Sequence, residues 1–464
     1  MQTNEKNLTR GSISKNIWYL ALPLMATNAI QTGFNLVDIA FVGRLGPESV
    51  AAVSLVGAIM MLPFSMILGL AIASGAMISR FYGSKDYHHV GHVIIQSILS
   101  SVFGGILVTI AGIALGRYLF AVFGIEDKVA QLAIIYVRIL FIGTVPIALQ
   151  FLIAAIFQAL GDASKALYIN VFGIMINIIL DPLLIFGLWI FPRLEVAGAA
   201  LATTIGRTLA MFLAFYLLYA KTHHLPIVWN RLRFHKQTIM TIVKIGVPSS
   251  LQMSFRSVSS MVMMGIISRY GTATLAAYGI GIRLDMLTMM PGFGLAAATA
   301  TLVGQNLGAK EPKRAEQSSW YSAIYFIVIM STTGVIFYAF PKIIFSLFND
   351  SETVIQNGVL YLRIIVLSYP FIAVSIILTR ALAGAGETII TMLITLFSLF
   401  GIAVPLAFLI PAFTNSGALG VWVAIAVSNM VHSIIITLLF FQGKWKKKKI
   451  DIGSLQRTEL INDL

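Results

Sequence analysis

The sequence predicts an all-α membrane protein of twelve transmembrane helices, arranged as two related bundles of six. Of the 464 residues, 58% are hydrophobic and only 11% are charged, a balance that does not suit a soluble protein of this length. Apolar runs of about 20 residues, the length needed to cross a hydrocarbon core, recur from end to end. The two halves of the chain also match each other at one fixed offset.

The apolar runs are rich in Gly, Ala, Ile, Leu and Phe and show no alternating polar pattern, so they predict helices rather than the strands of a barrel. The first run is too long for the apolar core of a signal peptide and leads directly into further spans, so we expect it to be retained. The expected spans are 17–42, 50–80, 93–119, 129–157, 164–190, 196–220, 240–268, 274–303, 316–340, 354–380, 388–411 and 416–441.

Basic residues concentrate on one side of these spans. Twelve spans place both termini on the same side, which also carries the Lys and Arg residues of the N-terminal segment 1–16, the connector 221–240 and the tail 442–464. The opposite loops offer single basic residues. The positive-inside rule therefore predicts that both termini are cytoplasmic. We interpret the net charge of +14 as this topology signal rather than as a surface for nucleic acid.

An internal repeat relates the two halves. Matches at an offset of 225 residues include Pro23 with Pro248, Gly69-Leu70-Ala71 with Gly294-Leu295-Ala296, Gly83 with Gly308, and Gly161-Asp162 with Gly386-Glu387. Each half holds six spans, so the copies keep one orientation and should be related by a pseudo-two-fold axis along the membrane normal. This predicts an N-lobe at 17–220 and a C-lobe at 241–441, with the substrate path in the cleft between them.

Three carboxylates lie well inside predicted spans: Asp38, Asp181 and Asp285. An aspartate at the membrane centre costs roughly 2.5–3.5 kcal/mol on insertion scales, so each needs a partner or a function. The repeat places Met263 opposite Asp38 and Leu406 opposite Asp181. The fold therefore does not require these two acids, and the asymmetry indicates a function for them.

Each of these two acids shares a helix face with amides: Gln31 and Asn35 with Asp38, and Asn170 and Asn177 with Asp181. Pro23 lies early in the first span, and Pro182 directly follows Asp181. A proline frees a backbone carbonyl four residues earlier, and such carbonyls beside carboxylates suit Na⁺ or the water around a protonated acid. Removal from water also favours a protonated carboxyl, which suits proton exchange. Hydrogen bonding between helices is the alternative role for these side chains.

Two further in-membrane residues receive separate interpretations. Asp285 lies two residues from Arg283, a spacing that does not pair side chains on one helix, so we expect Asp285 to form a salt bridge to another helix. Arg256 replaces Gln31 in the repeat. It either lines the cleft or extends to the membrane interface, and the sequence leaves both open.

The sequence lacks the motifs of an enzyme or a nucleotide-driven pump. Cysteine is absent, which excludes disulfides, thiolate metal sites and Cys nucleophiles. We find no H-E-x-x-H, no G-x-S-x-G and no Walker A lysine. We therefore predict no enzymatic activity, no bound cofactor and no use of ATP, so an ion gradient must drive any uphill transport.

The chain resembles the multidrug and toxic compound extrusion (MATE) family, bacterial members in particular, over residues 12–441. The most specific segments are Gln31–Asp38, Asn177–Gly187, Pro291–Gly294, Val303–Ala309, Gly161-Asp162 and Ala385–Thr388. The resemblance implies a V-shaped pair of bundles that exports lipophilic, mainly cationic drugs or toxic compounds by alternating access, in exchange for H⁺ or Na⁺.

The resemblance also implies a cation-coupling site in the N-lobe, formed by Asp38, Asp181, Asn177, Tyr136 and Thr203. Na⁺ as the coupling ion would bind at the first three of these residues. The candidates for the substrate cleft and for gating are Pro23, Gln31, Asn35, Asn170, Arg256 and Asp285. Some relatives carry a seventh-span Glu where this chain has Arg256, which argues against a second cation site in the C-lobe.

The expected partners are small amphiphilic substrates and the lipid bilayer, without nucleic acid, and the expected state is a monomer in the cytoplasmic membrane of a bacterium or archaeon. The alternative function is a lipid-linked saccharide flippase of the same superfamily. Its anionic substrates would suit Arg256, Arg283 and Arg380. The complete N-lobe motif and the lack of extra spans favour the drug exporter.

Overall fold

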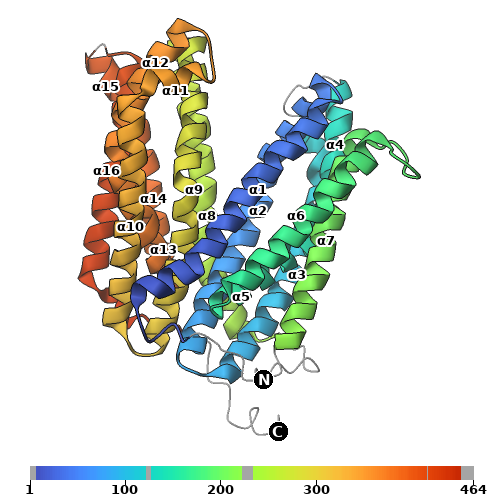
Figure 1. Ribbon diagram of the computed structural model, residues 1–464, viewed down its shortest axis with the longest axis vertical. Coiled ribbons are helices and arrows are strands. Elements are labelled where there is room, and N and C mark those ends of the chain that lie inside the picture. Colours follow the sequence, from blue (N-terminus) through green and yellow to red (C-terminus); the bar gives the residue numbers. More distant parts are fainter. Residues whose placement is uncertain (1–6, 122–126, 222–233, 415, 451–464) are drawn as a thin grey trace.

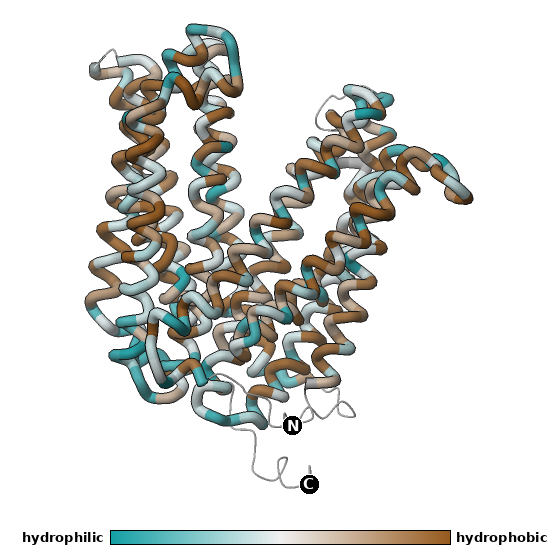
Figure 2. The backbone as a smooth tube through the Cα atoms, in the orientation of Figure 1, coloured by the Kyte–Doolittle hydropathy of each residue, from teal (hydrophilic) through white to brown (hydrophobic). Residues whose placement is uncertain are grey.

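The computed structural model describes residues 7–121, 127–221, 234–414 and 416–450. Within these residues the chain is almost entirely helical and contains no strand. Two bundles diverge from a shared end into a V (Figure 1), and hydrophobic residues run along the length of both (Figure 2). The predicted all-α fold of two lobes is confirmed. Most of the predicted connector and the end of the basic tail lie outside the described residues.

The N-lobe consists of α1 (Ile13–Gly43), α2 (Pro47–Gly83), α3 (Tyr87–Ala121), α4 (Asp127–Ile142), α5 (Thr144–Ala159), α6 (Ala163–Phe186) and α7 (Glu195–Lys221). The C-lobe consists of α8 (Lys236–Ile267), η2 (Ser268–Tyr270), α9 (Thr272–Gly308), α10 (Pro312–Ala339), α11 (Pro341–Ser346), α12 (Glu352–Ile365), η3 (Val366–Ser368), α13 (Tyr369–Gly384), α14 (Ile389–Leu396), the π-helical η4 (Phe397–Ala403), α15 (Val404–Thr414) and α16 (Ala418–Gln442). A short η5 (Lys444–Lys447) begins the tail.

Nine helices in the described part of the chain are long and apolar enough to cross a membrane, and the pair α4–α5 makes a tenth. This pair is bent by 50°, so the predicted span 129–157 is broken at Gly143 rather than straight. Helices α1 and α8 are equally long but carry more polar side chains, including the amide and acid stripe of α1 and Arg256 of α8. They correspond to the remaining two predicted spans.

The first helix of each lobe packs into the core of the other lobe. Ile17, Leu20 and Leu24 of α1 are buried in a cluster built mainly from C-lobe residues. Ile242 and Ile245 of α8 are buried in a cluster of N-lobe residues. The other half of α1 packs against α6 of its own lobe, and the other half of α8 packs against α14. The exchange is reciprocal, as the sequence repeat requires.

Repeat-related glycines let the lobes touch at the shared end of the V. A Cβ atom added to Gly83 of α2 would clash with the backbone oxygen of Gln305 in α9, and one added to Gly308 of α9 would clash with the backbone oxygen of Arg80 in α2. Only a residue without a side chain allows helices to approach this closely. We call this end, where Gly83 and Gly308 meet the opposite helix, the closed end, and the other the open end.

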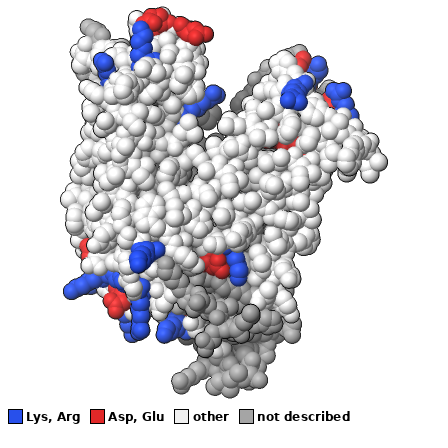
Figure 3. Space-filling model, in the orientation of Figure 1, with Lys and Arg blue, Asp and Glu red and all other residues white. Residues whose placement is uncertain are grey.

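Side-chain amides reinforce the closed end. Gln305 Nε2 in α9 donates to the backbone oxygen of Ala159 in α5 at 2.8 Å, and Gln158 Nε2 in α5 donates to the backbone oxygen of Ala297 in α9 at 3.1 Å. The described residues before α1, 7–12, and after α16, 443–450, lie at this same end. The lobes separate toward the open end, where a space-filling view shows a notch between them (Figure 3).

The close contact of α2 with α9 at Gly83 yields a stability prediction. Gly83→Ala should lower the free energy of unfolding by about 1–3 kcal/mol, because a methyl group forced against a backbone carbonyl must displace a helix. Gly75→Ala in the same helix is the control, since an added Cβ there meets nothing within 4 Å. Thermal unfolding in detergent should rank Gly83→Ala below Gly75→Ala, and the reverse order would contradict this packing.

Candidate functional site

Three of the predicted site residues meet where α6 packs against α7. Asp181 is fully buried in α6, and Asn177 lies one turn before it at 4% exposure. In the amide orientation that satisfies both of its ends, Asn177 Nδ2 donates to Asp181 Oδ2 at 2.7 Å. Asn177 Oδ1 then accepts hydrogen bonds from the hydroxyl and the backbone N–H of Thr203, both at 2.9 Å. The structure thus brings the predicted Thr203 to Asn177.

Small residues bring α6 and α7 close enough for this contact. A Cβ added to Gly206 of α7 would approach the backbone oxygen of Gly173 to 2.8 Å and the backbone nitrogen of Asn177 to 3.3 Å. A Cβ added to Gly173 of α6 would meet the Ala210 side chain at 2.9 Å. The close helix approach follows from these small residues, and it is what lets Asn177 reach across to α7.

Asp38 faces the same group from α1. Its carboxylate interacts electrostatically with that of Asp181. Both carboxylates also interact electrostatically with the buried hydroxyl of Tyr136 in α4. Asp38 is half-buried, and its Oδ1 atom is enclosed without a hydrogen-bond partner. Asp38 and Asp181 each lie five residues before the open end of their helices. The structure therefore gathers all five predicted coupling residues in the outer half of the N-lobe.

The two aspartates lack a compensating positive charge. In the described part of the chain, the ion pairs involve other acids, and neither Asp38 nor Asp181 contacts a Lys or Arg. Two neighbouring carboxylates cannot both remain ionised at low cost. A proton or a monovalent cation would relieve the repulsion, and oxygen donors from acids, an amide and hydroxyls suit either. No group of three or more His, Cys, Asp or Glu that could hold a metal ion occurs among the described residues.

A second polar cluster lies deeper in the N-lobe and is centred on Arg207 of α7. Arg207 Nη2 donates to Gln31 Oε1 at 2.9 Å, and its Nη1 donates to Gln150 Oε1 at 3.3 Å. Gln31 also donates to Asn35 at 3.1 Å, and Gln150 donates to the buried Asn170 at 3.0 Å. Three of the predicted cleft residues thus belong to one network that joins α1, α5, α6 and α7.

Our sequence reasoning missed Arg207 and Gln150. Arg207 was detectable, because an ionisable residue inside an apolar span marks a functional or paired position. Its guanidinium carbon also lies 5.3 Å from the centre of the Phe151 ring. Gln150 gave no such signal, since a single amide in a span is compatible with ordinary helix packing.

The salt bridge expected of Asp285 is wrong. Asp285 of α9 accepts hydrogen bonds from the hydroxyls of Tyr361 at 2.5 Å and Tyr369 at 2.7 Å, and no ion pair to it occurs among the described residues. Two hydroxyls occupy both carboxylate oxygens without bringing another charge into the membrane. Tyr361 is the repeat partner of Tyr136, so each lobe sets a buried tyrosine near an acid, although the acids come from different helices.

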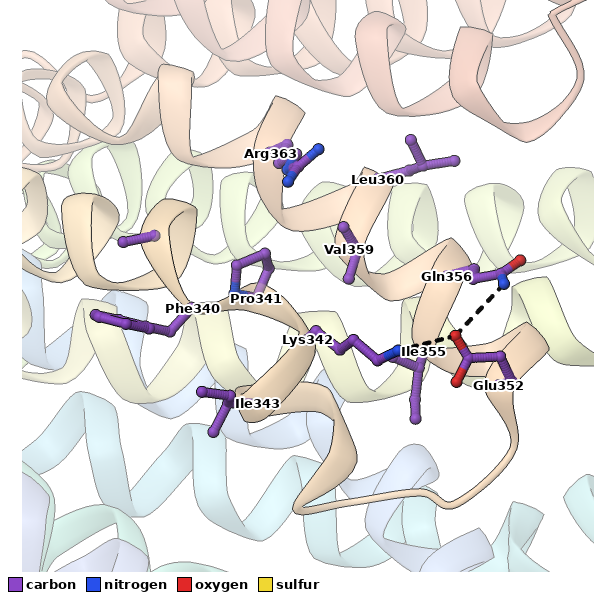
Figure 4. A pocket seen from close by; sticks show the side chains of 11 residues that line it. Phe340, Pro341, Lys342, Ile343, Glu352, Ile355, Gln356, Val359, Leu360 and Arg363 are labelled. Carbon is purple, nitrogen blue, oxygen red and sulfur yellow. Dashed lines mark hydrogen bonds and ion pairs between the residues drawn. The ribbon is translucent and has the colours of Figure 1, made fainter.

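The remaining candidates lie apart from the aspartate pair. Pro23 lies inside α1, which continues as one helix, and the hydroxyl of Thr27 donates to the Pro23 carbonyl at 2.9 Å. Arg256 lies in α8 and its side chain is exposed. The cavity of about 590 Å³ in Figure 4 is lined by residues of α10 to α12 at the open end of the C-lobe, including Lys342 and Glu352. It contains none of the predicted site residues.

Comparison with known families gives a match to the MatE family model over residues 23–183 and again over residues 248–409. The two matched segments begin 225 residues apart, which is the offset of the internal repeat. Together they cover most of both lobes.

Individual proteins match over nearly the whole chain. The probable multidrug resistance protein YoeA of Bacillus subtilis is 28% identical over 461 residues, covering 97% of this chain and 99% of that protein. A FAD transporter of Shewanella oneidensis is 25% identical, covering 92% and 94%. The solved outward-facing structure of a multidrug resistance MATE family transporter of the MOP superfamily is 26% identical, with a TM-score of 0.89 over 97% of this chain and 100% of that chain.

The Arg207 network yields a double-mutant prediction. Gln31→Ala should lower the free energy of unfolding by about 1–3 kcal/mol, because it leaves a largely enclosed guanidinium without its nearest acceptor. In an Arg207→Met background the same change should cost less than about 0.5 kcal/mol, since no unpaired charge remains. Unfolding of the four proteins in detergent measures the difference. An equal cost of Gln31→Ala in both backgrounds would show that Arg207 does not depend on this bond.

Proposed function

Because the chain belongs to the MatE family, we propose that it is a secondary active antiporter that exports lipophilic, mainly cationic drugs or toxic compounds in exchange for an incoming cation. The observation that carries this proposal is the pair of uncompensated carboxylates, Asp38 and Asp181, which the N-lobe has and the C-lobe copy lacks. When ionised, such a pair attracts a cation, and when protonated it releases one. The proposal needs neither ATP nor a bound cofactor, and a monomer suffices for it.

We assign the closed end to the cytoplasm. The loops after α2 and α9 carry Lys85 and Lys310 there, the first turn of α10 carries Lys313, and the described part of the tail adds Lys444 and Lys446. Positive residues concentrate on the cytoplasmic side of membrane proteins. On this assignment the structure is outward-open, with the outer half of the N-lobe, and the aspartate pair in it, on the external side. The similarity to an outward-facing transporter supports this orientation.

The contact between Asn177 and Asp181 favours H⁺ as the coupling ion. An ionised Asp181 accepts a hydrogen bond from Asn177 Nδ2. The reversed amide is disfavoured, because its NH2 group would face the backbone N–H of Thr203 at 2.9 Å. A protonated Asp181 still has an oxygen that accepts from Asn177 Nδ2, so the acid can take up a proton while the amide stays in place. A Na⁺ ion between the two side chains would require them to move apart.

Helix α1 supplies the link between ion binding and export. Its outer half carries Asp38 beside α6, and its inner half is buried in the C-lobe core. Protonation of the acid pair removes the repulsion between α1 and α6, so it changes how α1 packs between the lobes. Cationic substrate and proton then compete for the same carboxylates, which satisfies the thermodynamic requirement that the two ligands favour different states.

A lipid-linked saccharide flippase, or another exporter of anionic substrates, is the second candidate. The exposed Arg256 in the C-lobe favours it, because a cationic drug would be repelled there. A relative named as a FAD transporter also shows that this architecture occurs in a protein named for an anionic substrate. Transport assays with ethidium and with an anionic lipid-linked sugar separate the two candidates.

Replacement of the half-buried acid tests the proposed coupling. Asp38→Asn should reduce gradient-driven ethidium efflux from proteoliposomes to background, because an amide of the same shape cannot take up a proton. Asp86→Asn, the same change at a loop carboxylate that bonds His89, should leave efflux unchanged. Circular dichroism and elution volume verify that both variants are folded. Wild-type efflux by Asp38→Asn would refute the coupling role.

The identity of the ion is a separate prediction. A proton gradient directed into the proteoliposomes, in Na⁺-free buffer, should drive ethidium efflux by the wild-type protein. A Na⁺ gradient in the same direction at equal pH should drive almost none. The reason is the short Asn177–Asp181 contact, which accommodates a proton without rearrangement. Efflux driven equally well by Na⁺ alone would mean that the site opens to admit the larger ion.

A further inference from the structure

The interior of the C-lobe contains three basic side chains that converge from different helices. They are Arg256 of α8, Arg380 of α13 and His432 of α16. Arg256 interacts electrostatically with both Arg380 and His432. Arg256 is exposed, Arg380 is partly exposed, and His432 is 7% exposed. A ligand can therefore reach both arginines, with the imidazole enclosed beside them.

The two arginines lie on helices that run in opposite directions. Side chains of an α-helix tilt toward its N-terminus. Helix α8 begins at the closed end and α13 begins nearer the open end, so the Arg256 side chain leans toward the closed end and the Arg380 side chain leans toward the open end. One turn before Arg256, Gln252 Nε2 donates to Thr395 Oγ1 at 2.7 Å, which fixes this face of α8 against α14.

These basic groups offer hydrogen-bond donors and find no acceptors. Among the described residues, Arg256 and Arg380 take part in no hydrogen bond and no ion pair. His432 Nδ1 lies 3.2 Å from the hydroxyl oxygen of Ser398, while its Nε2 is buried without a partner. With Ser398 donating to Nδ1, the proton of the neutral ring lies on Nε2. The oxygens of Asp285 are already occupied by tyrosines.

Comparison with the N-lobe copy shows what is missing. The repeat places Arg256 opposite Gln31 and His432 opposite Arg207. In the N-lobe, Gln31 and Gln150 provide the acceptors that satisfy Arg207. In the C-lobe, Gln31 is replaced by the cation Arg256, and the position of Gln150 holds Ser375, which donates to its own helix. The same arrangement thus lacks its internal acceptors, and an anion from outside the chain would supply them.

A π-helical turn borders the same space. Element η4 (Phe397–Ala403) widens the helix at Ser398, whose backbone oxygen accepts a hydrogen bond from Ser428 at 2.6 Å. Such turns frequently occur at functional sites. The rings of Phe255 and Phe400 pack edge to face 6.3 Å apart, one residue from Arg256 and two from Ser398. This aromatic pair therefore joins α8 to η4, the same two elements that carry Arg256 and Ser398.

We propose that Arg256, Arg380 and His432 form a binding subsite for the phosphoryl group of an amphiphilic substrate. Two guanidinium groups and an imidazole N–H match the several oxygens of a phosphate ester, which arginine binds with paired hydrogen bonds. The apolar part of the substrate packs beside Phe255 and Phe400. The inference rests on the proposed transport function and extends it to substrates with a negative group. The phosphoryl group belongs either to a water-soluble amphiphile or to a membrane lipid.

Equilibrium binding tests this subsite separately from transport. Full-length protein in phosphatidylcholine nanodiscs is titrated with 1-naphthyl phosphate and, as the uncharged match, 1-naphthol. Wild type should bind the phosphate at least about tenfold more tightly than the alcohol, the difference expected for charge-assisted hydrogen bonds. Arg256→Gln and Arg380→Gln should each remove most of this preference. Arg256→Gln introduces the residue that the N-lobe copy carries at the same place, so it should fold.

Arg363→Gln is the matched control, because Arg363 is an exposed arginine of α12 at the distant cavity of Figure 4. It should bind 1-naphthyl phosphate as wild type does. A second series contains phosphatidic acid in the nanodiscs. If phosphatidic acid weakens the binding of 1-naphthyl phosphate, the subsite is assigned to a lipid headgroup. If the lipid does not compete, the subsite is assigned to a soluble phosphate.

Two results would overturn the subsite: no preference for the phosphate in wild type, or an unchanged preference in both Arg256→Gln and Arg380→Gln. Failure of proton-driven ethidium efflux would leave these binding results intact. The two proposals can therefore fail independently.

Discussion

Helix α1 belongs to both lobes, and this double attachment is the constraint on which the proposed mechanism depends. Its inner half is buried among C-lobe side chains, while its outer half presents Asp38 to Asp181 of α6. A change of charge at Asp38 therefore acts on a helix that cannot move within one lobe alone. Helix α8 makes the reciprocal crossing, but it carries Met263 where α1 carries Asp38. The chain thus has two symmetric crossing helices, α1 and α8, and only α1 carries the carboxylate at this position.

Differences between the copies identify the chemistry better than their similarities do. The glycines at the α2–α9 crossing recur because both lobes need the same close contact. The acids do not recur, and neither do the acceptors around Arg207. Each departure leaves groups unsatisfied within a low-dielectric region, where an unpaired charge costs several kcal/mol. In the N-lobe the unsatisfied groups are anionic and suit a cation, whereas in the C-lobe they are cationic and suit an anion. The two proposed sites therefore have opposite polarity.

Much of the fold was predictable, because hydropathy and the internal repeat act over many residues at once. The structure also brings Asp38, Asp181, Asn177, Tyr136 and Thr203 to one part of the N-lobe, and their role in cation coupling stays a prediction. The bend at Gly143 and the π-helical turn were not predictable, since both arise from packing against neighbouring helices. The prediction of a salt bridge for Asp285 failed for a similar reason. Spacing along one helix cannot show that tyrosines 76 and 84 residues away will supply its hydrogen bonds. The partners of Arg207 likewise come from two other helices, α1 and α5.

The most direct test of the central claim measures whether protonation of the N-lobe acids moves the lobes. The chain contains no cysteine, so spin labels can be placed without background at Ile190 and Leu347, which are 90% and 77% exposed at the open ends of the N-lobe and the C-lobe. Double electron–electron resonance would report the distance between them in nanodiscs at acidic and alkaline pH. We expect the distance distribution of wild type to shift with pH and that of Asp38→Asn to remain fixed. The same pH response in both proteins would contradict the claim that Asp38 couples proton binding to lobe movement.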